Sequence, residues 1–156
     1  MADFIYTEAK SRILTSQLNL ATASLKMMLV EPDYVPNQEQ IYIDDGTDNA
    51  PANFELSGTG YISGFAGSGR ILLTNKVLSK DASAHRMRFI FDNVRWLALA
   101  VPSQLIGACI MVLEAGISDA TSLLIMYRSS GGFSQPDPGG QEFRITVNQT
   151  TGFWAF

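Results

Sequence analysis

The chain of 156 residues has one cysteine and one histidine. One cysteine cannot form an internal disulfide, which excludes a small disulfide-stapled secreted scaffold. One histidine excludes zinc sites built from several histidine ligands. Cys109 lies within an apolar run, where we expect a buried and unreactive thiol. His85 stands at the start of an expected strand, where we expect an exposed ring rather than a catalytic group.

Charge of either sign is also scarce, with 11 basic and 15 acidic residues and no block of one sign. A nucleic-acid-binding protein normally carries a basic patch, so we expect no direct contact with nucleic acid. A membrane-spanning helix needs about 18 consecutive apolar residues. The nearest candidate, residues 94–112, is interrupted by Arg95, Pro102 and Gln104. The N-terminal sequence lacks the pattern of a secretory signal. We therefore expect a protein made in the cytoplasm, without a membrane partner.

The motifs that usually carry chemistry are incomplete. In the glycine-rich stretch from Gly58 to Gly69, the third glycine falls one position late for a dinucleotide fingerprint, and no Lys-Ser/Thr pair follows. We interpret it as a turn-and-bulge segment. The acidic residues 44–48 lack the alternating ligands of a calcium loop, which favours a solvated turn. No Asp or Glu stands in a clearly apolar stretch that would suit a general acid. We expect no enzymatic activity, metal or cofactor.

What the sequence does have is a series of short apolar or alternating runs between residues 54 and 125, nearly all closed by Gly, Asp, Asn, Ser or Pro. This spacing is typical of an all-β domain. The length and the 46% hydrophobic content predict one domain over residues 1–156. We predict an antiparallel β-sandwich, of jelly-roll or immunoglobulin-like topology, with one short N-terminal helix.

The expected helix is capped by Thr7 and runs through residues 8–14, with Glu8 in its first turn. The dipeptide Asp92-Asn93 is expected to close a hairpin between two neighbouring strands. Residues 31–52 are expected to form a long contact loop, and residues 129–141 a Gly/Pro-rich surface loop. The expected strands are 23–30, 54–56, 61–65, 71–77, 86–91, 95–101, 107–113, 123–127 and 142–147.

Two of these strands, 95–101 and 107–113, are apolar on both faces. An antiparallel strand normally has one face toward water. Either another element such as the N-terminal helix covers the second face, or that face meets another chain. On this ground we expect self-association or docking, in a closed homo-oligomer or on a repeating lattice.

Several segments, in order along the chain, resemble a widespread family of small structural proteins of tailed-phage virions. They are LKMMLVEPDYVPNQEQ (25–40), FELSGTGYISG (54–64), FDNVRWLALAV (91–101), LLIMYRSSGG (123–132) and FRITVNQTTGFWAF (143–156). The second of these matches the family's signature E-[VL]-S-G-T-G-Y-x-x-G. Val147 stands where the family usually has an aromatic residue.

The resemblance implies a β-rich virion protein without enzymatic activity, whose partners are the major capsid protein or neighbouring virion proteins. A capsid decoration, or cement, subunit that stabilises the head is the first interpretation, and a tail, baseplate or head-fibre component is the second. A carbohydrate-binding β-sandwich module remains a third, since aromatic residues are plentiful. The terminal segment either closes the domain's own sheet or anchors a neighbouring subunit. The candidate partner contacts are Tyr34, Tyr42, Phe133, Phe153, Trp154 and Phe156.

Overall fold

The computed structural model describes residues 3–102 and 104–155 and shows an all-β, sandwich-like fold. Its central antiparallel sheet has the strand order β1-β9-β8-β2-β3. These strands are β1 (Phe4–Ile5), β9 (Leu123–Arg128), β8 (Ala108–Leu113), β2 (Leu25–Val30) and β3 (Ile71–Leu72).

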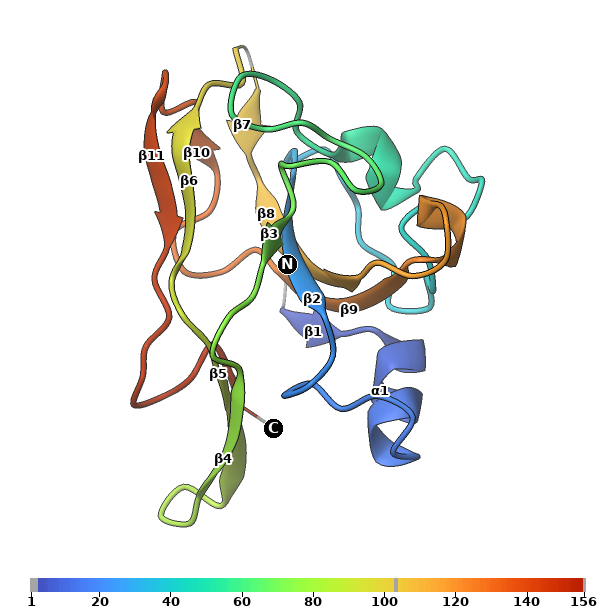
Figure 1. The fold of residues 1–156 in the computed structure, drawn as a ribbon, viewed down its shortest axis with the longest axis vertical. Helices are drawn as coiled ribbons and strands as arrows, with labels where there is room; N and C mark the ends of the chain where they lie inside the picture. The colour runs from blue at the N-terminus through green and yellow to red at the C-terminus, as the bar shows by residue number, and fades with distance from the viewer. Residues whose placement is uncertain (1–2, 103, 156) are drawn as a thin grey trace.

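Smaller antiparallel sheets form a second layer on one side of the central sheet. β6 and β11 stand along that side, and the hairpin of β4 and β5 extends away from the body (Figure 1). The pairs are β10 (Gln135–Pro136) with β7 (Leu105–Ile106), β11 (Gln141–Ile145) with β6 (Val94–Leu99), and β5 (Arg86–Ile90) with both β12 (Trp154–Ala155) and β4 (Val77–Asp81).

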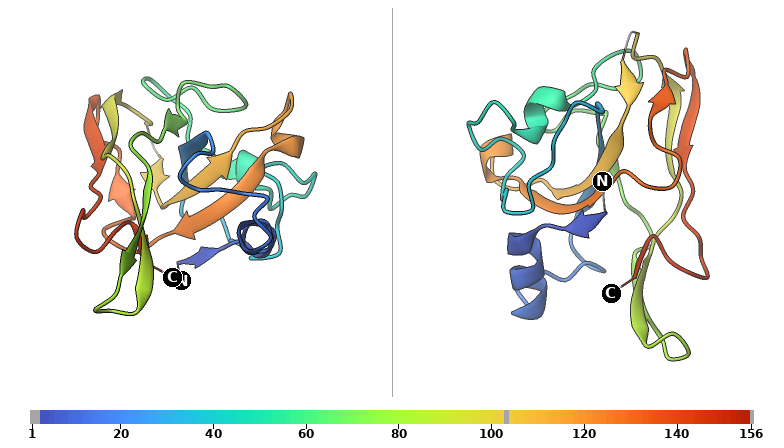
Figure 2. Two further views of the ribbon diagram at one scale, coloured as in Figure 1. Left: turned by 60° about the horizontal axis from the view of Figure 1, so that its bottom comes forward. Right: turned by 180° about the vertical axis from the view of Figure 1, so that it is seen from behind.

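The helix α1 (Thr7–Leu14) and the long loop cover the opposite side of the central sheet, as both views agree (Figures 1 and 2). The loop ends in the 3-10 helix η1 (Pro51–Phe54), and a second 3-10 helix, η2 (Asp119–Thr121), precedes β9. The ring of Tyr34 contacts Tyr127 of β9, with centroids 5.9 Å apart. With elements on both sides of the sheet, every residue of β8 from Ala108 to Val112 is buried within the chain.

The two strands with apolar residues on both faces thus differ in their surroundings. β8 is covered on both faces by its own chain, so its composition gives no ground for self-association. β6 is not: Val94, Trp96 and Leu99 are buried, whereas Leu97 is 74% exposed. Leu97, on the outer face of β6, is therefore an apolar side chain of this strand that another chain can reach.

The hairpin expected at Asp92-Asn93 is wrong, because β5 and β6 belong to different sheets. The carboxylate of Asp92 accepts hydrogen bonds from Thr74 and Asn75, at 2.8 and 2.7 Å. The side chain of Asn93 accepts one from the backbone N–H of Val147 at 2.9 Å. These bonds to distant residues fix the connection between β5 and β6, which passes from one sheet to another. The true hairpin joins β4 to β5 through residues 82–85, where His85 is exposed and has a φ of +52°.

Other expectations need smaller corrections. The helix is confirmed, but Tyr6 is its N-cap residue, and the hydroxyl of Thr7 donates to Glu39 instead of capping. Phe54 belongs to the 3-10 helix η1, and residues 55–56 and 61–65 form isolated bridges and turns rather than strands. The expected strand 71–77 is divided, because β3 ends at Leu72 and β4 begins at Val77. The surface loop 129–141 contains the short strand β10. The strands β1, β4, β7 and β10 had no recognisable pattern.

Candidate functional site

The signature segment 54–64 is part of a buried ionic cluster. The carboxylate of Glu55 accepts a hydrogen bond from the hydroxyl of Tyr61 at 3.1 Å and another from the backbone N–H of Gly64 at 2.9 Å. The hydroxyl of Tyr61 in turn accepts from the N–H of Leu29 in β2, at 2.9 Å. The two ends of the signature segment are therefore bonded to each other through Glu55, and Tyr61 bonds the segment to the central sheet.

Arg70 neutralises this cluster. Its side chain is fully buried and donates two hydrogen bonds to Glu55, at 2.8 and 2.6 Å, and two to Asp119, at 2.6 and 2.8 Å. A further bond of 3.1 Å reaches Glu114, which also pairs with Lys26 of β2 at 2.5 Å. Bidentate arginine–carboxylate pairs combine strength with fixed geometry. The cluster holds the loop 55–70 on the sandwich.

The electrostatics of the cluster follow from burial and these bonds. Burial alone would lower the pKa of Arg70, but hydrogen bonds to Glu55 and Asp119 raise it overall, so the guanidinium stays charged. Burial raises the pKa of Tyr61 well above its usual value, and the charge of Glu55 raises it further. Sequence reasoning found no acid in an apolar setting and so missed Glu55. A lone arginine between a glycine-rich loop and an apolar strand was the available signal.

Glycine is required where the signature meets the edge of β6. Thr59 forms a bridge with Ala100, whose N–H donates to the carbonyl of Thr59 at 2.9 Å. A Cβ at Gly60 would lie 2.2 Å from the carbonyl oxygen of Ala98, and Gly60 has a φ of +75°. Only glycine adopts this conformation at such close backbone approach without strain. The turn that we expected in the glycine stretch is confirmed here, because the backbones of Gly58 and Tyr61 exchange two hydrogen bonds, at 3.0 and 3.1 Å.

The chain matches no protein-family model, no curated protein and no solved structure. Within residues 3–102 and 104–155, no helix is long and apolar enough to cross a membrane. The same residues contain no group of three or more His, Cys, Asp or Glu side chains placed to hold a metal ion.

The predicted contact residues lie in different environments. Tyr34 is buried and its hydroxyl donates to Gln40 at 2.7 Å, while Tyr42 is half-buried beside a shallow acidic depression formed by residues 44–46 and Ala120. Phe133 is half-buried and lines a cleft.

The aromatic tail belongs to the protein's own sheet. Phe153 is buried beneath the guanidinium of Arg128, which lies 4.6 Å from the ring centroid. Trp154 is half-buried and pairs with Phe89 where β12 joins β5. Phe156 lies outside the described residues. The structure therefore agrees with the first interpretation of the tail, in which it forms the final strand of the domain's own sheet.

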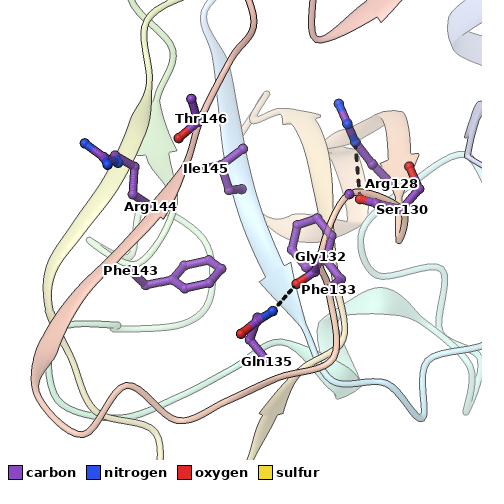
Figure 3. Close-up of a pocket in the computed structure, with 10 residues that line it drawn as sticks. Arg128, Ser130, Gly132, Phe133, Gln135, Phe143, Arg144, Ile145 and Thr146 are labelled. Atoms are coloured by element: carbon purple, nitrogen blue, oxygen red, sulfur yellow. Dashed lines mark hydrogen bonds between the residues drawn. The ribbon is translucent and has the colours of Figure 1, made fainter.

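Among the exposed parts of the described residues, two have a chemistry that suits a partner. The first, which we call the outer β6–β11 face, consists of Arg95 and Leu97 on β6 and Glu142 and Arg144 on β11. Arg95 and Arg144 stand directly opposite each other, and Glu142 lies 4.0 and 3.9 Å from them. The second is a cleft of about 370 Å³ between the inner side of β11 and residues 130–135 (Figure 3).

Proposed function

We propose that this protein is a non-enzymatic structural subunit of a tailed-phage virion, and within that class a capsid decoration subunit that stabilises the head. It would be made in the host cytoplasm and incorporated into the particle. Its mechanism is binding energy alone, which joins neighbouring lattice proteins without any chemical step.

The observation that carries the proposal is that the segments with the family resemblance pack on one another. Tyr61 of FELSGTGYISG stacks on Trp96 of FDNVRWLALAV, with ring centroids 6.4 Å apart, and Trp96 contacts Phe143 of the closing segment at 5.7 Å. Arg128 of LLIMYRSSGG covers Phe153 of the same closing segment. Residues scattered along the sequence thus meet in one core. This supports a resemblance of the whole fold rather than of isolated motifs.

The outer β6–β11 face has the chemistry of a docking surface. Protein interfaces combine an apolar centre with arginine and a polar rim. Here the exposed Leu97 stands beside Arg95 and Arg144, and Glu142 offsets one of their two charges. The complementary partner is an acidic surface with an apolar recess, on the major capsid protein or a neighbouring virion protein.

Particles assembled without the subunit provide the test. We expect the purified protein to bind them, and Leu97→Ser to weaken binding about tenfold or more, since burying a leucine contributes about 1.5–3 kcal/mol. Leu14→Ser is the matched control, because Leu14 is 84% exposed on α1, on the opposite side of the sheet. Equal effects of the two substitutions would contradict this docking face.

Copy number separates the two virion roles. Quantitative mass spectrometry of purified particles should find copies in proportion to the capsomers if the protein decorates the head. A handful of copies per virion would contradict decoration and favour the tail, baseplate or head-fibre alternative. Absence from the particle, together with no binding to it, would overturn the virion proposal altogether.

A further inference from the structure

The cleft is built from two walls that are far apart in the sequence. One wall is formed by residues 130–135, which follow β9 and end at the first residue of β10. The other wall is formed by residues 143–146, at the end of β11. Figure 3 shows the rings of Phe133 and Phe143 pointing toward each other across the space, with Gln135 below them. Its volume of about 370 Å³ lies at the lower end of pockets that hold small ligands.

Both walls are held in place before any ligand arrives. Phe143 packs on the buried ring of Trp96, whose indole N–H donates to the carbonyl of Gly69 at 2.7 Å. On the other wall, the N–H groups of Ser129 and Ser130 each donate to the carboxylate of Asp3 at 3.0 Å. The N–H of Ser134 donates to the carbonyl of Ile106 at 2.9 Å. A preorganised site loses less conformational entropy on binding.

Two arginines, Arg128 and Arg144, line the cleft, but their charged groups are directed toward other partners. Arg128 lies 3.7 Å from the carboxylate of Asp3, donates to the carbonyl of Phe153 at 2.8 Å and covers that ring. Arg144 points away from the Phe143 ring, toward the opposite side of β11 (Figure 3), and lies 3.9 Å from Glu142. The interior of the cleft therefore suits an uncharged ligand.

From this geometry we propose that the cleft binds one unit of a neutral saccharide. A pyranose ring presents weakly positive C–H groups on its faces, and these stack favourably against the negative faces of aromatic rings. Phe133 and Phe143 supply two such surfaces. The ring hydroxyls need donors and acceptors at the edge, which the amide of Gln135, the hydroxyl of Thr146 and the exposed backbone at Gly132 provide. The proposal is independent of the virion role.

The polar groups also favour a saccharide over an aromatic side chain of a partner protein. Such a side chain would be bound best by a deep pocket without polar groups, because burying unpaired polar atoms costs free energy. Here Gln135 is exposed at the floor, and its amide N–H donates to the carbonyl of Gly132. That amide remains at the surface, where it can exchange partners with a hydroxylated ligand.

The test is a titration of the ¹⁵N-labelled protein with neutral disaccharides, namely cellobiose, maltose, lactose and N,N′-diacetylchitobiose, up to about 20 mM, well above a millimolar Kd. We expect at least one of them to shift the backbone amide signals of Gly131, Gly132, Phe133 and Thr146 in a saturable manner. N-acetylphenylalanine amide serves as the peptide comparison. If none of the disaccharides shifts these signals, or only the peptide compound does, the proposal is overturned.

Variants then locate the site. Phe143→Leu keeps an apolar side chain but removes the aromatic face, so binding should weaken about fivefold. Gln135→Ala changes an exposed residue and should also weaken binding while the protein remains folded. Gln141→Ala is the matched control, because Gln141 is an exposed glutamine on β11 that does not line the cleft, and it should leave the Kd unchanged. Unchanged binding by both Phe143→Leu and Gln135→Ala, or loss of binding by Gln141→Ala alone, would refute the assignment.

Discussion

Replacing Arg70 by methionine tests the buried ionic cluster directly. The substitution keeps a long, flexible side chain but removes the charge that pairs with Glu55, Asp119 and Glu114. The side chain of Glu55 is only 1% exposed, so water cannot replace the lost guanidinium without disrupting the packing. Removing one partner of a buried ion pair typically costs about 3–5 kcal/mol, because the remaining charge stays buried without compensation.

We therefore expect Arg70→Met to lower the free energy of unfolding by about 3–5 kcal/mol in urea denaturation at 25 °C. For a chain of this size that corresponds to a fall in melting temperature on the order of 10 °C. Arg12→Met is the matched control, because Arg12 forms a partly exposed pair with Glu8 at 2.7 Å within α1. Its loss should cost about 0.5 kcal/mol or less.

A double-mutant cycle with Glu55→Gln separates the ion pair from other effects of the substitution. If the charges on Arg70 and Glu55 stabilise each other, the double variant should be more stable than the sum of the two single changes predicts, by about 1 kcal/mol or more. A cost for Arg70→Met no larger than that for Arg12→Met, with no coupling in the cycle, would refute the reasoning.

Gly60→Ala should destabilise the protein by several kcal/mol in urea denaturation, because the new Cβ would meet the backbone of β6. Gly46 has a similar φ but open space around its Cβ position, so Gly46→Ala should cost only about 1–2 kcal/mol. Equal costs of the two substitutions would contradict the close approach to β6. The hydrogen bond from Ser83 lowers the pKa of Asp81, so this contribution to stability is complete above the unfolded pKa and disappears as pH falls through the folded one. Ser83→Ala should raise the pKa of Asp81 in a carboxyl NMR titration, and no change would disprove this cause. Burial raises the pKa of Cys109, so a thiol reagent should label it in urea but hardly at all in the native protein.

Strands with a strong local pattern were predictable. β5 and β11 alternate, and β8 and β9 are continuous apolar runs, so their existence follows from a few neighbouring residues. The buried thiol of Cys109 follows from the same reasoning. Strand partners did not follow, because they depend on bonds between distant residues. Asn93 illustrates this: its side chain holds Val147, 54 residues along the chain.

The surfaces were harder to predict than the core. The cleft forms only when β11 and residues 130–135 come together through pairings with β6 and β7. Phe133 was identified as a contact residue from the composition of its loop, but no sequence signal related it to Phe143. In the same way, Glu55 and Arg70 are 15 residues apart, and Asp119 is 49 residues from Arg70. Sequence periodicity describes one element at a time, whereas these sites lie between elements.

The ionic cluster around Arg70 also affects how stability changes with temperature. The cost of removing charges from water falls on heating, since the hydration of ions carries an unfavourable entropy, while the hydrophobic contribution levels off. A network in which Arg70 and Lys26 share three carboxylates therefore contributes relatively more to a hot protein than to a cold one. The loop 55–70 should consequently stay attached to the sandwich close to the temperature at which the whole domain unfolds, rather than detaching first as surface loops commonly do.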